Sequence, residues 1–99
     1  MQKLIETRIE IDEKITASEK LPETMILYTM DADHFVITVK PLKTLEERAL
    51  TRTRVEVTSR QNKYVVKLPL KIYNFYHLDE NDYTVMVSNK DPTTIVIAI

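Results

Sequence analysis

The sequence of 99 residues contains neither cysteine nor glycine. Without cysteine, disulfide bonds and thiolate-bound zinc are excluded. Without glycine, the phosphate-cradling loops of Rossmann and Walker folds cannot form, and a nucleophile elbow loses the glycines that normally flank its serine. Turns must be built from Asn, Asp, Pro, Ser and Thr instead. These absences predict a non-enzymatic chain, with no catalytic residue, cofactor or metal.

Long apolar runs are also missing, since no stretch approaches the roughly 18 residues that cross a bilayer. Residues 1–6 contain no apolar signal block. We therefore expect no membrane partner and an intracellular, cytoplasmic location. The length suits a single domain over residues 1–99. Abundant charge without glycine or cysteine favours a thermostable protein.

Alternating polar and apolar residues predict a mainly β fold with short helices, an α+β chain. Strands are expected at 7–11, 35–39, 53–57, 64–68, 83–87 and 94–99, with the last two forming a hairpin. Short helices are expected at 23–30 and after Pro69, and at 44–50 through a capping box of Thr44 and Glu47. Asn81 is expected to take a left-handed conformation in the turn at 79–82.

The two halves of the chain, 7–39 and 53–99, align on either side of a connector at 40–52. The aligned stretches are 7–11 with 53–57, 20–22 with 67–69, 28–31 with 76–79, and 35–39 with 83–87. Two β-rich segments of similar composition also align by chance, so duplication is one of two interpretations. Two copies would form a small β-barrel of pseudo-symmetric halves, each covering the other's apolar face.

The second half contains a strand, a Leu-Pro pair, a short amphipathic helix, an Asp turn and a hairpin. The residues that carry this order are 65–72, 78–82, 85–87 and 95–97. Residues 53–99 thereby resemble the AbrB/SpoVT (MazE-like) swapped-hairpin family, and 7–39 would be a degenerate tandem copy. The resemblance implies a swapped-hairpin barrel and a DNA-binding transcription regulator. Where the family has arginines early in its short helix, this chain has Tyr73 and Asn74.

A weaker resemblance, in composition alone, is to small accessory proteins of viruses that infect thermophilic archaea. It implies a host-cytoplasmic viral protein and leaves the function open.

Positive charge gathers in one segment, residues 51–71, where Glu56 is the sole acid. Its six bases are the candidate nucleic-acid-binding residues: Arg52, Arg54, Arg60, Lys63, Lys67 and Lys71. Such a segment attracts anionic partners and can contact backbone phosphates. Arg60, Gln61 and Asn62 are the candidates for reading base edges. The alternative is a solvated strand face whose charges protect a sheet edge.

Two other groups of residues have a structural and a functional interpretation. The aromatic residues Tyr64, Tyr73, Phe75 and Tyr76 suit core packing better than stacking on unpaired bases. His34 and His77 each lie near an aspartate, but two histidines in separate turns make a poor metal site, so surface turns are expected.

The leading prediction is a nucleic-acid-binding module, a DNA-binding regulator of AbrB-like type. The alternative is a protein–protein interaction or viral accessory module with no nucleic-acid role. A homodimer is a further expectation, through pairing of an exposed apolar edge at 95–99.

Overall fold

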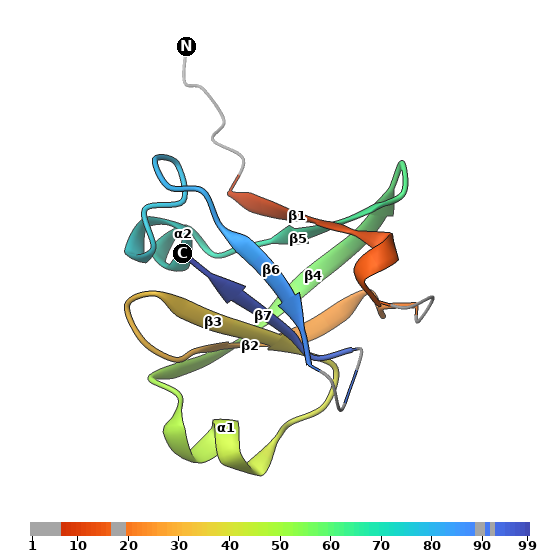
Figure 1. Cartoon of the computed structure of the whole chain (residues 1–99). Coiled ribbons are helices and arrows are strands. Elements are labelled where there is room, and N and C mark those ends of the chain that lie inside the picture. Colours follow the sequence, from red (N-terminus) through yellow and green to blue (C-terminus); the bar gives the residue numbers. More distant parts are fainter. Residues whose placement is uncertain (1–6, 17–19, 89–90, 92) are drawn as a thin grey trace.

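The computed structural model describes residues 7–16, 20–88, 91 and 93–99 (Figure 1). Over these residues the chain forms one antiparallel sheet of seven strands in the order β1-β5-β4-β2-β3-β7-β6. The strands are β1 Arg8–Asp12, β2 Thr24–Thr29, β3 His34–Thr38, β4 Thr51–Arg60, β5 Lys63–Lys67, β6 Thr84–Val87 and β7 Ile95–Ala98. A 3-10 turn, η1 (Glu13–Thr16), and two helices, α1 (Lys43–Arg48) and α2 (Leu70–Phe75), complete it. The expected mainly β barrel with short helices is confirmed.

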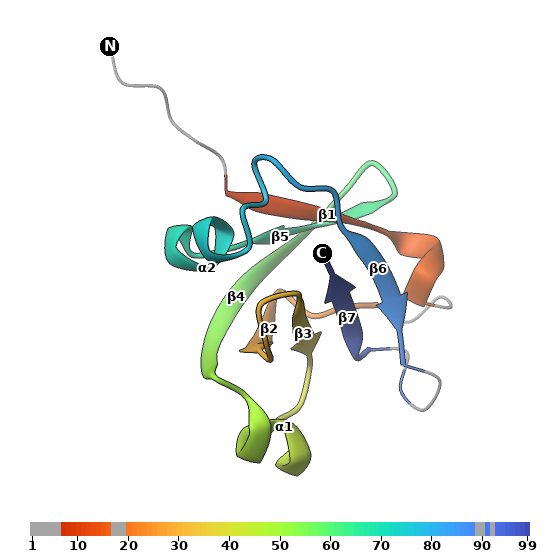
Figure 2. The ribbon, with the colours of Figure 1, turned by 60° about the vertical axis from the view of Figure 1, so that its left-hand side comes forward.

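The sheet curls into a nearly closed barrel (Figure 2). Strand β4 makes this curvature possible, because Thr51–Glu56 pair with β2 and Glu56–Arg60 pair with β5. The two edges of the sheet are β1 and β6. A side chain bridges them: the Tyr83 hydroxyl, next to β6, is bonded to the backbone of Glu10 on β1.

Alternating residues of the strands fill the barrel. Ile9 and Ile11 point inward from β1, Val55 and Val57 from β4, and the residues between them are exposed or partly exposed. Such alternation is the signature of a sheet with one buried face, and these strands follow the sequence-based expectation closely.

Strand β2 differs, because it is buried on both faces. Met25 and Leu27 belong to the main core, while Ile26 and Tyr28 are buried on the outside. Arg52 of β4 pairs with Tyr28 across the sheet and points to the same outer side. Its guanidinium donates a hydrogen bond to Glu46, so helix α1 also lies on this side. The helix predicted at 23–30 is therefore wrong: a continuous apolar run here is a doubly covered strand, which periodicity cannot distinguish from a helix.

The two halves of the chain interleave along the sheet. After β1, the β4–β5 hairpin, the β2–β3 hairpin and the β6–β7 hairpin follow in turn, so strands of the first and second half alternate in groups. The alignment of the halves matches β1 with β4 and β3 with β6, but it also matches strand β2 with helix α2. The duplication stays a prediction, and its middle portion has unlike structure in the two halves.

The expected dimer edge is not an edge in this chain. Strand β7 pairs with β3 on one side and with β6 on the other, so its backbone hydrogen bonds are satisfied internally. Pairing of 95–99 with another chain is therefore ruled out as the basis of a homodimer, while the homodimer itself stays a prediction.

The turns show how a chain without glycine reverses direction. Gln61 and Asn62 both have positive φ, 51° and 66°, as a two-residue type I′ hairpin requires. His77, at φ 51°, follows helix α2 in a Schellman arrangement, in which Leu78 N–H donates to Tyr73 O and His77 N–H to Asn74 O. The left-handed residue of this region is therefore His77, and the expectation for Asn81 is wrong.

The expected capping box is also wrong. Helix α1 begins at Lys43 with Leu42 as its N-cap, and no side chain caps it. Thr44 thus lies inside the first turn, where its hydroxyl cannot serve as the cap. Neither α1 nor α2 is long enough to cross a bilayer, and the described residues contain no other helix that could.

Candidate nucleic-acid interface

The six predicted bases are all exposed. Five of them lie on the two strands β4 and β5 and share the outer face of the barrel, because the residues that alternate with them point into the core. The members of this group are Arg52, Arg54, Arg60, Lys63 and Lys67. The sixth, Lys71, lies on helix α2 and is separate from the strand face.

Strand pairing adds the outer residues of β1 to the same surface. Across the sheet, Lys67 lies between Arg8 and Glu56, and Lys63 lies between Asp12 and Arg60. We call this surface the basic face: the bases Arg8, Arg52, Arg54, Arg60, Lys63 and Lys67, with the acids Glu10, Asp12 and Glu56 among them. Bases outnumber acids two to one, so its net charge is positive although the whole chain has a net charge of −1.

A polar hollow of about 280 Å³ lies on the basic face beside the β4–β5 turn. Its lining includes Arg8, Arg60 and Lys63, together with Glu10, Gln61 and Val65. Three cations and one carboxylate, Glu10, line the hollow, so its net charge is positive and favours an anion there. Arg8 was not among the predicted bases: its outward direction follows from alternation in the first strand, but its position next to β5 follows from strand order, which is a long-range feature.

Ion pairing leaves most of the predicted bases available. Arg52 is engaged, since its guanidinium Nη1 lies 2.8 Å from the Glu46 carboxylate of α1. Lys63 Nζ lies 3.7 Å from Glu10 Oε2, a contact between exposed groups that solvent screens. Among the residues that the structure describes, Arg54, Arg60, Lys67 and Lys71 form no ion pair.

The aromatic residues near the bases divide into two kinds. Tyr64 and Tyr76 are buried in the core and Tyr73 packs against it, as the structural interpretation predicts. Phe75 differs, because half of its surface is exposed. It lies on α2 beside Lys71, where both line an apolar groove.

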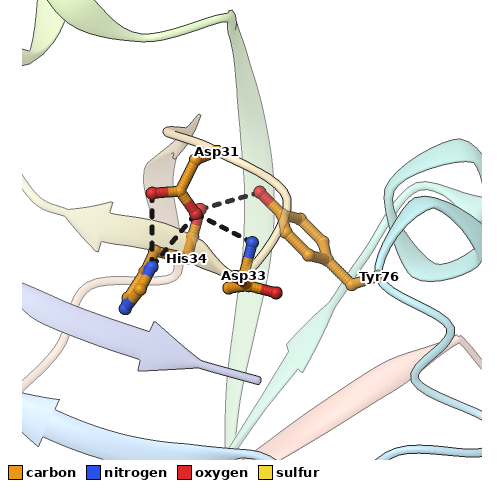
Figure 3. A network of polar contacts seen from close by, with 4 residues as sticks. All are labelled: Asp31, Asp33, His34 and Tyr76. Atoms are coloured by element: carbon orange, nitrogen blue, oxygen red, sulfur yellow. Dashed lines mark hydrogen bonds and ion pairs between the residues drawn. The ribbon is translucent and has the colours of Figure 1, made fainter.

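His77 lies in an exposed turn, as expected, whereas His34 is the exposed first residue of strand β3, directly after the β2–β3 turn. In the β2–β3 turn, Asp31 Oδ1 accepts a hydrogen bond from the Asp33 N–H at 2.8 Å and lies 3.0 Å from His34 Nδ1 (Figure 3). The Asp33 N–H, followed by the imidazole, lowers the pKa of Asp31 below its ordinary value. The Tyr76 hydroxyl donates to the His34 carbonyl at 2.8 Å. Burial, and then the charges of Asp31 and Asp33, raise the pKa of Tyr76 to about 12.

These contacts describe a turn anchored to the core. The Asp31 carboxylate accepts a hydrogen bond from the turn backbone, and the buried Tyr76 donates one to the backbone at the end of the turn. Across the part of the chain that the structure describes, no three His, Asp or Glu side chains gather in a way that would hold a metal ion.

The chain matches no protein-family model, no curated protein and no solved structure. The structure by itself shows the architecture, a small antiparallel, nearly closed β-barrel.

Proposed function

We propose that this chain is a nucleic-acid-binding module whose basic face contacts the phosphate backbone. The observation that carries the proposal is the grouping of Arg54, Arg60, Lys63 and Lys67 on one exposed sheet face, three of them without an ion pair among the described residues. Cations grouped on a surface bind nucleic acid by neutralising phosphates and releasing condensed counterions.

The dimensions of the basic face suit the sugar-phosphate backbone of a nucleic acid. Arg54 and Arg60 are six residues apart on one strand, which is a length of about 20 Å measured along the curved strand at the rise of a β-strand. Double-stranded DNA presents a phosphate about every 3.4 Å of axis on each strand, so several phosphates fall within that span. The hollow at Arg8, Arg60 and Lys63 offers one deeper anion position at the end of the row.

Phosphate contact fits this surface better than base reading. Between the bases the face consists of short side chains such as Val65 and Thr58, and it carries no helix that would enter a groove. The turn at Gln61 and Asn62, which joins β4 to β5, remains as the candidate for contact with bases. We therefore propose weak sequence preference and strong dependence on salt.

The AbrB/SpoVT resemblance supports a regulatory form of this function. Strand β5, Pro69, helix α2 and the β6–β7 hairpin follow one another as in that family's pattern. The departure at Tyr73 and Asn74 removes the helix arginines of the family. In this proposal DNA is therefore bound by the sheet and not by α2, and transcription regulation within the cell is the corresponding role.

The proposal is tested by charge removal at matched positions. The triple variant Arg54→Ala/Arg60→Ala/Lys63→Ala removes three cations from the basic face. A control, Lys14→Ala/Lys20→Ala/Lys43→Ala, removes three exposed cations elsewhere and changes net charge equally. In fluorescence anisotropy at low salt with labelled duplex and single-stranded DNA, the first variant should lose at least tenfold in affinity and the control little. Equal losses, or no binding by the unmodified chain, would refute the proposal.

A further inference from the structure

An apolar groove separates helix α2 from the start of strand β4. Its volume is about 360 Å³, within the range of sites that take a ligand or a side chain. Pro69, Ile72 and Phe75 form the wall on α2, while Leu50 and Thr51 form the opposite wall, with Thr29 beneath. The groove borders the basic face at Arg52, which belongs to both. The phosphate contacts proposed for Arg54, Arg60, Lys63 and Lys67 leave the groove unused.

The groove exposes two large apolar side chains that a lone domain would normally cover. Leu50 is 63% exposed and Phe75 is 50% exposed, and they stand on opposite walls. A Leu–Phe pair open to water in a concave site marks an interaction surface.

Phe75 is held rigidly in spite of its exposure. Its ring packs edge-on against Tyr76, with ring centroids 4.9 Å apart. Tyr76 in turn packs on Phe35 at 4.8 Å and donates a hydrogen bond to the His34 carbonyl (Figure 3). A partner that contacts Phe75 therefore meets a preorganised ring and loses little side-chain entropy on binding.

Two of the three threonines that line the groove, Thr29 and Thr51, already have their hydroxyls hydrogen-bonded. The hydroxyls of Thr29 and Thr51 are hydrogen-bonded to each other, and the Thr51 N–H donates to the Thr29 hydroxyl at 3.0 Å. The threonines thus leave few hydrogen-bonding groups for an occupant, so the groove favours an apolar side chain.

Both charged residues that line the groove are cations. Lys71 extends from α2 with no ion pair among the described residues, and Arg52 borders the opposite wall, where it is bonded to Glu46. An apolar site bordered by positive charge is complementary to an apolar side chain that is flanked by carboxylates.

We propose that this groove docks a short acidic segment of a partner protein, with a large apolar side chain between Leu50 and Phe75 and a carboxylate on Lys71. The inference goes beyond the nucleic-acid function and does not depend on it. A second copy of this chain is disfavoured, because a twofold contact would bring Lys71 and Arg52 against the same cations. A stacked nucleobase is disfavoured, because the floor has few groups to pair its polar edge.

The test uses the full chain and synthetic peptides. The probe is a labelled peptide with Phe and Leu four positions apart among glutamates, so that both lie on one helical face. A second peptide has lysines in place of the glutamates, and a third has alanines in place of Phe and Leu. Binding is measured by fluorescence anisotropy, and its location by amide chemical shifts in NMR spectra.

We expect saturable binding of the acidic peptide, with shifts centred on Leu50, Thr51 and Phe75. Phe75→Ala should weaken it about tenfold or more. Leu50→Ala, at a more exposed position with less effect on folding, should do the same. Lys71→Glu should weaken the acidic peptide and strengthen the lysine peptide. Met86→Ala, an exposed apolar position on β6 outside the groove, is the matched control and should change nothing.

Several outcomes would overturn the inference. They are equal binding of the lysine or alanine peptide, full binding by the Leu50→Ala and Phe75→Ala variants, or shifts centred elsewhere. Self-association that Leu50→Ala abolishes would assign the groove to a second copy of the chain. Displacement of the peptide from Phe75 by an oligothymidine would assign it to nucleobases.

Discussion

The phenol of Tyr83 is hydrogen-bonded to both backbone polar groups of Glu10. It accepts from the Glu10 N–H at 2.9 Å and donates to the Glu10 carbonyl at 3.3 Å. Glu10 lies on edge strand β1, and Tyr83 immediately precedes edge strand β6. At the opening of the barrel, the Tyr83 hydroxyl therefore satisfies the Glu10 N–H and carbonyl, which a further strand paired with β1 would otherwise bond.

Removing that hydroxyl should loosen the barrel at its opening. Tyr83→Phe keeps the ring and removes two hydrogen bonds, so we expect a loss of about 1 kcal/mol in the free energy of unfolding. Chemical denaturation measures the loss, and faster hydrogen exchange of the Glu10 amide would locate it. Unchanged stability together with unchanged Glu10 exchange would show that the bridge does not hold the edges together.

Two buried tyrosines should respond oppositely to the same change. Tyr76→Phe breaks the bond to the His34 carbonyl and should cost about 1 kcal/mol. The Tyr28 hydroxyl is the one buried side-chain polar group that has no hydrogen-bond partner within the described residues. Tyr28→Phe should therefore be neutral or stabilising by up to about 1 kcal/mol. Denaturation of the two variants side by side checks this, and a larger loss for Tyr28→Phe would contradict it.

The left-handed turn residues offer sites for stabilisation. A non-glycine residue in the left-handed region destabilises the folded chain by roughly 1–2 kcal/mol. Substitution by glycine removes this cost, but part of the gain is lost because glycine has greater conformational entropy in the unfolded chain. Gln61→Gly and His77→Gly should each raise the free energy of unfolding by about 0.5–1 kcal/mol.

Thermal or chemical unfolding of these glycine variants measures the gain. Thr58→Gly, on β4 near Gln61 but within a strand, is the control and should be destabilising. Destabilisation by Gln61→Gly and His77→Gly would show that the two side chains make contacts worth more than the strain.

The β2–β3 turn should lose stability in acid. The pKa of Asp31 is lowered below its ordinary value of 3.8 in the folded chain. The Asp31 carboxylate therefore stabilises the fold above pH 3.8, and this stabilisation is lost as the pH falls through the pKa of the folded chain. An NMR titration should place the Asp31 pKa below 3.8. The stability difference between the unmodified chain and Asp31→Asn should shrink as the pH falls below 3.8, and a difference that grew instead would contradict the assignment.

Sequence patterns located most of the strands because their faces have different environments. Ile9 and Ile11, or Val55 and Val57, alternate with solvent-facing residues, and that period is visible without coordinates. Strand β2 was predicted as a helix because Ile26 and Tyr28 on its outer face are buried, as are Met25 and Leu27 on its inner face. Strand order, and with it the internal position of β7, depends on contacts between distant segments that no local pattern encodes.

The candidate site divides in the same way. The outward direction of Arg54 and Arg60 follows from alternation with buried Val55 and Val57, and so could be predicted. The addition of Arg8 required the β1–β5 pairing. The groove between Leu50 and Phe75 arises where α2 meets the start of β4, and in the sequence these residues are simply two apolar side chains in separate segments.

The salt dependence of binding tests most directly whether the basic face binds the phosphates of a nucleic acid. For duplex DNA, each phosphate neutralised contributes about −0.9 to the slope of log affinity against log salt. Contacts by Arg54, Arg60, Lys63 and Lys67 predict a slope of about −3 to −4, reduced to about −1 in Arg54→Ala/Arg60→Ala/Lys63→Ala. A slope near zero, or the same slope in both proteins, would contradict the claim.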